Sequence, residues 1–568
     1  MATRKLDAGL HPEFHYEQRL SPVRARIRSW LLPIIRREKE ILVFIQSSLR
    51  HPFLDWYFPI TSNLGTHTFY MVCLPLLFWF GYAPLGRGLT LVVASGVFWT
   101  GFVKDMLCLP RPLSPPINRM TMSGTHHLEY GFPSTHTANA ISITLYLLAF
   151  VTQINDIDPN TRKFCIVALI VYCSSVVLGR IYCGMHSITG GTIMGAFLWW
   201  FQWNWQSDID AFILSDSWFV PMAILSATVL LIYIFPEPVD NCPCFEDCVA
   251  FAGVIMGLLP GCWRYARSKY SLPGIDRANV PYDYQIIGLP KSLGRLVIGV
   301  AILFIWRMVM KKILYMTLPP FYRALNLNIY RKDYLPAKDY KNLSPYSIRA
   351  FPSVLNLLQA PIHSTGPQST ADLYEQLDAE KENERGLIAR RRVNGSFAHD
   401  NHNLDQHDNK NNSEKVNLGN NNIKNGNVRE SSIIDNNDSD EENKNDENFE
   451  DNKHKNEKKN IVSFDAIEEP PLRYDVDVVV KLVVYAGIGW LAVDLIPVFF
   501  ELSGLGVNIV ARNQIVERYA DLDRRTLRPL IPQDREVSQD YPDREVSQDY
   551  PVHFFNSILR EVNFVDYT

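Results

Sequence analysis

One stretch of this sequence, "GFPSTHTANAISITLYLLAF", joins two hydroxyls and a histidine directly to a long apolar run. The first turn of a helix leaves backbone N–H groups unpaired, and the helix dipole favours an anion at that end. If a helix begins here, Ser134, Thr135 and His136 surround a suitable seat for a phosphate group. A serine or threonine before a helix is also an ordinary N-terminal cap, so this stretch alone leaves both interpretations open.

Two cations follow a neighbouring apolar run in "FVKDMLCLPRPLSPP". Pro110 and Pro112 prevent a helix from continuing past Leu109. Lys104 therefore closes the run, and Arg111 reaches back from an extended loop. Taken alone, each could also be a snorkelling charge at a membrane boundary.

A third stretch, "VLGRIYCGMHSITGG", places Arg180 and His186 six residues apart where one apolar run turns into the next. Guanidinium forks suit a tetrahedral oxyanion, and two histidines suit a displacement that needs both a nucleophile and a proton donor. On its own the pair could equally consist of interfacial anchors.

The apolar runs that position these residues have the length of membrane-crossing helices. About 17–25 apolar residues in a helix span the hydrocarbon core of a bilayer. Nine segments fit: 66–84, 86–103, 136–154, 164–182, 187–205, 217–235, 248–263, 294–314 and 478–500. The sequence therefore predicts an all-α fold, a polytopic transmembrane helical bundle with about 8–9 spans.

Counting the crossings brings the three stretches to one face of the membrane. The second run ends at Lys104, the third begins at His136 on the same face, and the fourth returns there with Arg180. The sequence therefore predicts a site for phosphoryl transfer at the ends of these helices.

The average composition hides this organisation. The chain has 568 residues, a formal net charge of -4 and a mean hydropathy of -0.07, which by themselves suit a large soluble protein. The apolar region 66–316 and the polar region 360–470 cancel in the mean. The polar region holds too little apolar surface to offset the entropy of ordering its backbone, so we expect it to be disordered.

In type and spacing these residues resemble the three signature motifs of the type 2 phosphatidic acid phosphatase superfamily. The matching positions are Lys104, Arg111 and Pro112, then Pro133, Ser134 and His136, then Arg180 and His186. The stretches 54–81 and 180–187 are similar to the sphingosine-1-phosphate phosphatase branch. The polar insert before a final span resembles that of its fungal members, the long-chain base phosphate phosphatases.

The resemblance implies a role for each matching residue. His186 would be the nucleophile that forms a phosphohistidine, and His136 the general acid that protonates the leaving alcohol and later activates water. The implied phosphate-binding residues are Lys104, Arg111, Ser134, Thr135 and Arg180. Neither a metal nor another cofactor is implied, because fixed cations and dipoles meet the charge of the transition state.

The implied substrate is a membrane lipid, a sphingoid base 1-phosphate, hydrolysed to the free base and phosphate. The resemblance further implies a multi-pass protein of the endoplasmic reticulum membrane with a luminal catalytic face and no nucleic acid partner. The sequence carries no signal for an oligomeric state. Charge leaves the orientation open, because basic residues occur both in the loop 264–295 and in the N-terminal segment.

Three positions depart from the family pattern. Thr135 replaces a usual glycine, Gly179 a usual serine, and Gly190 an aspartate that normally fixes the tautomer of the nucleophilic histidine. We therefore expect a less strongly oriented His186, and an aspartate introduced at position 190 to keep or raise turnover. Asp494 is the first candidate for a substitute partner.

Two other functions stay open at this point. One is a broader phosphatase or phosphotransferase acting on phosphatidate or isoprenoid phosphates, and the other is a catalytically weak membrane scaffold, which Gly190 makes plausible. Cys242, Cys244 and Cys248 lack a fourth ligand for zinc and could instead form a disulfide if they face the lumen. The adjacent pair at 126–127 makes a poor metal site without other ligands.

We expect five regions along the chain. They are a basic N-terminal segment at 1–40, a membrane-embedded phosphatase core at 41–320, a polar, largely disordered insert at 321–470, a final transmembrane region at 471–505, and a C-terminal tail at 506–568. The tail carries the nonapeptide "DREVSQDYP" twice in tandem.

Overall fold

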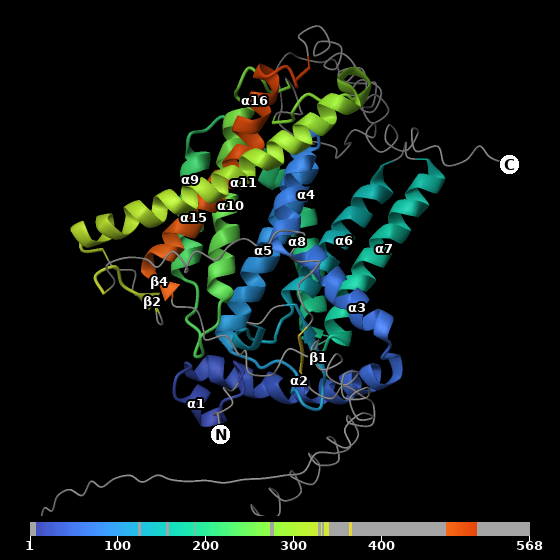
Figure 1. The fold of residues 1–568 in the computed structure, drawn as a ribbon, viewed down its shortest axis with the longest axis vertical. Helices are drawn as coiled ribbons and strands as arrows, with labels where there is room; N and C mark the ends of the chain where they lie inside the picture. Colours follow the sequence, from blue (N-terminus) through green and yellow to red (C-terminus); the bar gives the residue numbers. More distant parts are fainter. Residues whose placement is uncertain are drawn as a thin grey trace, which may run out of the picture. The chain divides into compact units, whose positions relative to one another are not determined.

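The computed structural model is predominantly helical, as the sequence predicts (Figure 1). It describes residues 7–122, 126–154, 158–187, 189–272, 278–327, 331, 334–339, 363–365 and 473–507. Most of the expected insert and nearly all of the expected tail lie outside the described residues. The described residues all belong to one compact unit.

All nine apolar runs are helical in the structure. The helices are α1 Glu13–Glu17, α2 Pro22–Leu49, α3 Pro52–Thr61, α4 His67–Trp79, α5 Ala83–Leu107, α6 Thr135–Gln153, α7 Pro159–Tyr182, α8 Thr189–Leu214, α9 Phe219–Tyr233, α10 Cys244–Tyr265, α11 Tyr284–Ala324, α15 Asp475–Trp490 and α16 Ile496–Leu502. Short strands form two small pairs, β1 Arg119–Thr121 with β3 His363–Thr365 (antiparallel) and β2 Tyr334–Leu335 with β4 Arg473–Tyr474 (parallel).

Five of the described helical segments are long and apolar enough to cross a membrane. They are α5, α7, α10, α11 and the continuous stretch Asp475–Leu502. Helices α4 and α9 are shorter, and α6 and α8 are long enough but less apolar. The chain is therefore a multi-pass membrane protein, while the expected total of eight or nine spans stays a prediction.

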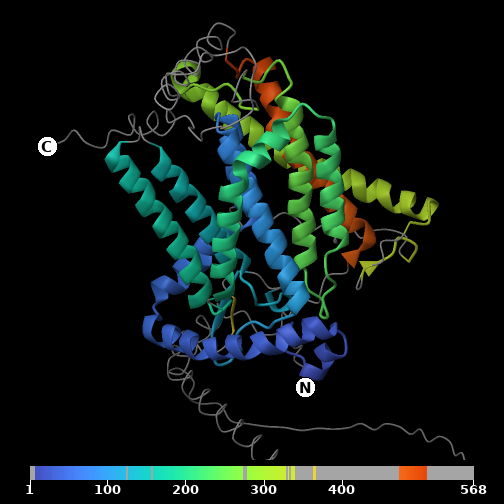
Figure 2. The ribbon, with the colours of Figure 1, turned by 180° about the vertical axis from the view of Figure 1, so that it is seen from behind.

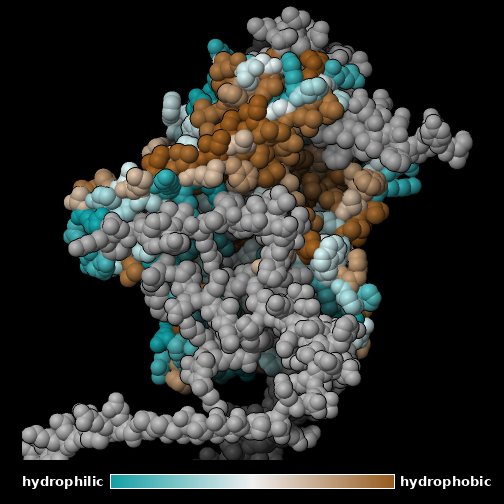
Figure 3. Space-filling view, viewed as in Figure 1, coloured by the Kyte–Doolittle hydropathy of each residue, from teal (hydrophilic) through white to brown (hydrophobic). Residues whose placement is uncertain are grey.

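An apolar exterior agrees with this assignment. Figure 3 shows hydrophobic surface over α11. Large apolar side chains on that helix are exposed, among them Leu289, Val297, Ile305, Met308 and Met316. Since lipid tails solvate such side chains as well as a protein core does, their exposure is expected for a helix that faces the bilayer.

Helix α5 lies at the centre of the bundle. It packs against α4, α6, α8 and α10, and α10 in turn packs against α15 of the last transmembrane segment. Its buried residues continue along most of its length to Lys104 and Asp105. The C-terminal end of α5 therefore opens inside the bundle, where its polar residues have protein neighbours instead of bulk water.

The basic N-terminal segment lies across that same end of the bundle. Helix α2 crosses below α5, α6 and α7 in both views (Figures 1 and 2). Arg24 donates to the carbonyl oxygens of Asp105 and Met106, both at 2.8 Å, and Arg28 donates to Leu107 at 3.3 Å. The last carbonyls of a helix lack partners within the helix, so these arginines satisfy the end of α5.

Helices α10 and α15 pack at close range although more than 200 residues separate them in sequence. Helix α10 presents Gly253, Gly257 and Gly261, spaced four residues apart, to this contact. A Cβ atom added at Gly257 would lie 1.8 Å from the carbonyl oxygen of Ala486. Small residues at this spacing let two membrane helices approach until their backbones touch.

We expect Gly257→Ala to destabilise the bundle. The added methyl group meets backbone atoms of α15, which cannot rotate away, and overpacking of this kind costs about 1–3 kcal/mol. The measurement is the midpoint of thermal unfolding of the purified protein in detergent. Gly294→Ala is the matched control, because its nearest contact is the end of the Leu505 side chain at 3.2 Å. Equal midpoints for the two variants would contradict this account of the α10–α15 contact.

Candidate active site

The ends of three helices and two connecting loops converge at one end of the bundle. Lys104 stands in the last turn of α5, Thr135 begins α6, and Arg180 stands in the last turn of α7. Arg111 and His186 come from the loops that follow α5 and α7. The structure brings these five predicted residues together, as the contacts below describe.

His186 is the best-defined member of the group. Its Nδ1 lies 2.7 Å from the carbonyl oxygen of Gly131, and its Nε2 lies 2.9 Å from Arg180 Nη2 and 3.1 Å from Arg111 Nη1. A carbonyl can only accept a hydrogen bond and a guanidinium can only donate one. Nδ1 must therefore carry the proton, and the lone pair of Nε2 must point towards the two arginines.

The surroundings also keep His186 uncharged. Its side chain is 1% exposed. Burial lowers the pKa of His186 well below its ordinary value, and the positive charges of Arg111, Arg180 and Lys104 lower it further. The imidazole is therefore neutral at physiological pH, which is the state in which Nε2 can act as a nucleophile.

Lys104 and Arg111 share a partner that the sequence did not single out, Glu129. Lys104 Nζ donates to one carboxylate oxygen, and Arg111 Nη2 donates to the other at 2.5 Å. Burial alone would raise the pKa of Glu129, but the charges of Lys104 and Arg111 hold it well below its usual range. Glu129 is the only acidic residue between Arg111 and His136, which is the one signal by which the sequence could have drawn attention to it.

Arg111 keeps its charge despite its burial. Its Nε donates to the backbone carbonyl of Glu129 at 3.0 Å, and its Nη1 donates to that of Met185 at 2.8 Å. Burial lowers the pKa of Arg111 to about 10, with Glu129 acting in the opposite direction. The guanidinium is therefore still a cation at neutral pH, and it links the α5–α6 loop to the loop that carries the histidine.

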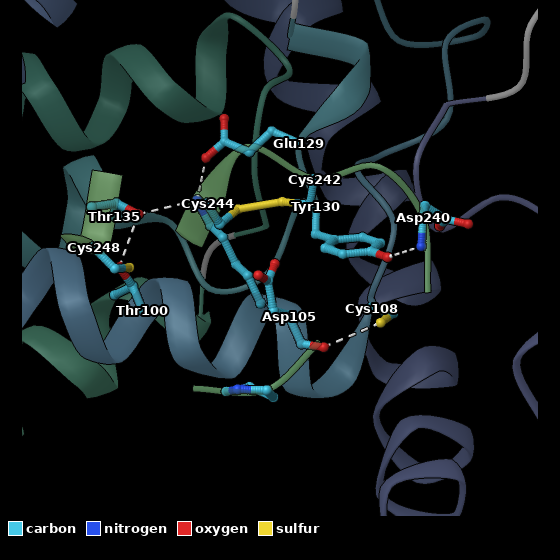
Figure 4. Close-up of a disulfide and its surroundings, with 12 residues drawn as sticks. Thr100, Asp105, Cys108, Glu129, Tyr130, Thr135, Asp240, Cys242, Cys244 and Cys248 are labelled. Carbon is cyan, nitrogen blue, oxygen red and sulfur yellow. Dashed lines mark hydrogen bonds and ion pairs between the residues drawn. A yellow bond between two sulfur atoms is a disulfide. The ribbon is translucent and has the colours of Figure 1, made fainter. Parts of the chain in front are cut away.

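The hydroxyls of Ser134 and Thr135 have separate structural partners. Ser134 caps α6, since its Oγ accepts from the backbone N–H of Thr137 at 3.3 Å and from the Thr137 hydroxyl at 3.0 Å. Thr135 Oγ1 lies 3.0 Å from Lys104 Nζ and 2.9 Å from Thr100 Oγ1 (Figure 4). The side chain of Thr135 therefore orients the lysine in addition to occupying the place of the family's usual glycine.

His136 stands in the first turn of α6 and is partly exposed. Gly65 backs its ring, because a Cβ added at Gly65 would lie 2.7 Å from the ring carbon Cδ2. When protonated, His136 lowers the pKa of Glu129, so its ring lies near enough to that carboxylate for their charges to interact. His136 is thus placed at the more open side of the group and His186 at its buried side.

The family assignment follows from comparison with known proteins. The model of the PAP2 superfamily matches residues 85–210, which include all of the residues described above except Gly65. A dihydrosphingosine 1-phosphate phosphatase of Schizosaccharomyces pombe is 38% identical over 311 residues, which cover 54% of this chain and 74% of the relative. The chain belongs to the PAP2 superfamily.

Further relatives agree with the resemblance to the sphingosine-1-phosphate phosphatase branch. A dihydrosphingosine 1-phosphate phosphatase of Saccharomyces cerevisiae is 32% identical over 309 residues, 54% of this chain and 74% of the relative. A probable sphingosine-1-phosphate phosphatase of Dictyostelium discoideum is 26% identical over 303 residues, 50% of this chain and 74% of the relative. No solved structure matches the chain.

The aspartate that the PAP2 superfamily usually places after the nucleophile is replaced here by a backbone group. The carbonyl of Gly131 accepts a hydrogen bond from Nδ1 of His186, so Gly190 does not leave the imidazole without an orienting partner. Gly131 is itself fixed, since its N–H donates to Leu109 at 2.9 Å and an added Cβ would lie 2.5 Å from the Cα of Arg111. A substitute for the usual aspartate is therefore present, and the expectation that it holds His186 less strongly than a carboxylate stays a prediction.

Asp494 does not supply the missing carboxylate either. It pairs with Arg264, which stands at the end of α10 opposite to Cys244. Asp105, beside Lys104, has its carboxylate within 4.8 Å of the Cys244 sulfur, so the site lies at the other end of that helix. The distance along α10 excludes a contact between Asp494 and His186.

The cysteines near the site form a disulfide, which was one of the two expected alternatives. Cys242 is bonded to Cys244 (Figure 4). Cys248 is a free, buried thiol whose Sγ lies 3.5 Å from the carbonyl oxygen of Val97. The three cysteines therefore do not converge on a common point as zinc ligands would. The buried carboxylate of Asp105 lies beside the disulfide.

We expect Gly190→Asp to lower activity strongly, in contrast to the expectation from the sequence. A Cβ at this position would lie 2.2 Å from the ring of Phe132, so an aspartate must displace either that ring or the loop that carries His186. Phosphate release from a sphingoid base phosphate by the purified variant is the measurement. Adding Phe132→Ala to Gly190→Asp makes room, and the double variant should regain part of the lost activity. Wild-type or higher turnover by Gly190→Asp alone would contradict this account of the contact between position 190 and Phe132.

Proposed function

We propose that this protein hydrolyses sphingoid base 1-phosphates to the free base and inorganic phosphate. The observation that carries the proposal is His186, whose unprotonated Nε2 lies within 3.1 Å of two guanidinium groups. The relatives, named as phosphatases of dihydrosphingosine 1-phosphate or sphingosine-1-phosphate, supply the substrate class. The helices that are long and apolar enough to cross a membrane are consistent with a substrate that is itself a membrane lipid.

In the first step, Nε2 of His186 attacks the phosphorus atom and the bond to the ester oxygen breaks. His136 gives its proton to that oxygen, so the sphingoid base leaves as an alcohol. Arg180, Arg111 and Lys104 donate to the non-bridging oxygens, whose negative charge is fully exposed to these donors in the transition state. The product is a phosphohistidine whose Nδ1 keeps its proton and still donates it in a hydrogen bond to the Gly131 carbonyl.

In the second step, the neutral His136 takes a proton from a water molecule that attacks the phosphohistidine. The bond between phosphorus and Nε2 breaks, phosphate is released, and both histidines return to their starting states. The backbone N–H groups at the start of α6 and the hydroxyl of Ser134 add donors from the side of the helix dipole. Every charge is met by groups of the chain itself, so we propose a mechanism that is independent of metal ions.

The observation that favoured a catalytically weak scaffold no longer supports it. It depended on Gly190 as the sign of an unoriented nucleophile, and the contact from His186 Nδ1 to Gly131 at 2.7 Å provides that orientation. A broader specificity for phosphatidate or isoprenoid phosphates is decided by experiment, because all of these lipids present the same phosphate to the same cations.

The test is phosphate release by purified protein from dihydrosphingosine 1-phosphate, phosphatidate and an isoprenoid phosphate side by side. We expect the highest kcat/KM for the sphingoid base phosphate. His186→Ala should abolish turnover, and His136→Ala should lower it at least about 100-fold, the least that a lost general acid usually costs. His127→Gln, in the preceding loop, is the control that should retain activity. Higher kcat/KM for either of the other lipids would overturn the proposed substrate class.

Vanadate should inhibit the wild-type protein because it adopts the trigonal-bipyramidal geometry of the displacement at phosphorus. Chelators should have no effect. Activity that EDTA removes and magnesium restores would contradict the metal-independent mechanism.

We further propose that the protein resides in the endoplasmic reticulum membrane with its catalytic end in the lumen. The disulfide between Cys242 and Cys244 lies at that end, and disulfides persist in oxidising compartments. By charge alone, the arginines of the N-terminal segment favour a cytosolic location for that segment. Two of them, Arg24 and Arg28, instead cap the C-terminal end of α5. Their charge is therefore weaker evidence for the membrane orientation of the protein than the sequence alone suggested.

Glycan acceptors report this orientation. Residues 7–20 lie at the catalytic end, where Ala8 donates to the His127 carbonyl, so an acceptor Asn-Gly-Thr on a flexible extension before Met1 should be glycosylated. The same extension inserted between Gln153 and Asp158, at the other end of α6, should not. A shift in electrophoretic mobility that an endoglycosidase reverses is the measurement, and the opposite pattern would place the site in the cytosol.

A further inference from the structure

Glu129 occupies an unexpected place for a carboxylate. It lies between Lys104 and Arg111, two of the cations that are available to bind the phosphate of the substrate. A fixed negative charge beside a bound phosphate dianion repels it, and repulsion between like charges is strong where water is scarce. A site that binds only phosphate would do better with a neutral residue at this position.

The exposure of the three side chains shows their order in the pocket. The side chains of Lys104 and Arg111 are 2% and 1% exposed, whereas that of Glu129 is 33% exposed. The carboxylate is thus the outer member of the group and the cations are the inner members. A substrate that enters the pocket meets the carboxylate before its phosphate reaches the cations.

Glu129 cannot withdraw far when the phosphate binds. Arg111 holds its backbone as well as its side chain, because Nε donates to the Glu129 carbonyl at 3.0 Å while Nη2 donates to the carboxylate at 2.5 Å. As the phosphate takes over donors from Lys104 and Arg111, the carboxylate loses partners but stays close by. It then needs a new positive partner next to the phosphate.

We infer that Glu129 binds the ammonium group of the substrate and thereby selects phosphate lipids that carry a free amine. This inference rests on the proposed function and adds a subsite to it. In a sphingoid base 1-phosphate, the amine is attached to the carbon next to the one that bears the ester oxygen. An ammonium has three N–H donors, so it can bind a Glu129 oxygen and still contact the phosphate. Lipids without an amine leave the carboxylate facing the phosphate with nothing between them.

The experiment compares substrates that differ only at the amine. The probes are dihydrosphingosine 1-phosphate, its N-acetyl derivative, which has no charge on nitrogen, and octadecyl phosphate, which has no nitrogen. A hydrogen bond to a charged group favours the matched substrate by about 10- to 100-fold. We expect the wild-type kcat/KM for the free amine to exceed those for the other two lipids by such a factor.

In Glu129→Gln this preference should fall to within a few-fold of unity, through a lower kcat/KM for the amine and an unchanged or higher one for octadecyl phosphate. Glu129→Asp, which keeps the charge on a shorter side chain, should retain part of the preference. The matched control is Glu246→Gln, since Glu246 also bridges one arginine and one lysine, Arg473 at 3.0 Å and Lys481, but outside the site. Its substrate preference should equal that of the wild type.

Inhibition by vanadate, which has no amine, separates substrate selection from loss of the phosphate site. A half-inhibitory concentration within a few-fold of the wild-type value in Glu129→Gln shows that the cations are still in place. An equal loss of kcat/KM on all three lipids would mean that Glu129 only holds Lys104 and Arg111 in position. An equal gain would mean that it only blocks access to them. Either result would overturn the ammonium subsite.

The wild-type protein alone distinguishes this inference from the proposed function. Equal kcat/KM for the free amine and octadecyl phosphate would overturn the subsite and leave sphingoid base phosphate hydrolysis intact. Turnover of phosphatidate without turnover of dihydrosphingosine 1-phosphate would overturn the proposed function itself.

Discussion

Lys104, Arg111 and Arg180 are buried together at one end of a helical bundle, and their mutual repulsion is the constraint to which the surrounding structure responds. Burying a charge is costly unless it is paired or hydrogen-bonded. Here the donors of the three cations are bonded to one carboxylate, to the Thr135 hydroxyl, to backbone carbonyls and to a single imidazole nitrogen. A phosphate group would supply the negative charge that balances these cations, so this end of the bundle has the electrostatic character that the proposed substrate requires.

The same cations determine the state of the proposed nucleophile. Burial and positive neighbours keep His186 unprotonated, and its Nε2 lone pair points towards two guanidinium groups, the cations to which we assign the phosphate. The backbone carbonyl of Gly131 then suffices to hold the other ring nitrogen, because the tautomer is already decided by the donors on Nε2. A carboxylate in that position would add negative charge next to the phosphate site, whereas a carbonyl adds only a dipole.

Helix ends give this site its rigidity. Lys104, Thr135 and Arg180 all stand within one turn of a helix terminus, where the backbone leaves groups unpaired and side chains can reach the pocket. The arginines of α2 satisfy the end of α5, so the N-terminal segment supports the site from outside although none of its residues is in contact with His186 among the described contacts. The apolar exterior in turn confines this polar end to the surface of the membrane.

Much of this architecture could be predicted from the order of residues. The apolar runs have the length of a bilayer, so their helical state was determined locally, and the count of crossings was enough to bring Lys104, Arg180 and His186 to one end. The prolines after Leu109 and the serine before Thr135 marked where helices end and begin, because these signals act within a few residues.

What remained was decided by contacts between residues that are distant in sequence. The partner of His186 Nδ1 is a backbone carbonyl 55 residues away. Because every residue has a backbone carbonyl, the residue types in the sequence could not predict this contact. Glu129 became part of the site only because the α5–α6 loop folds its carboxylate between two cations. The tolerance for a side chain at position 190 depends on the ring of Phe132. The sequence by itself determined which charges meet at the membrane surface, since helix length and order are local properties, and only the tertiary structure decided which atoms orient and balance them, since hydrogen bonds depend on positions in space.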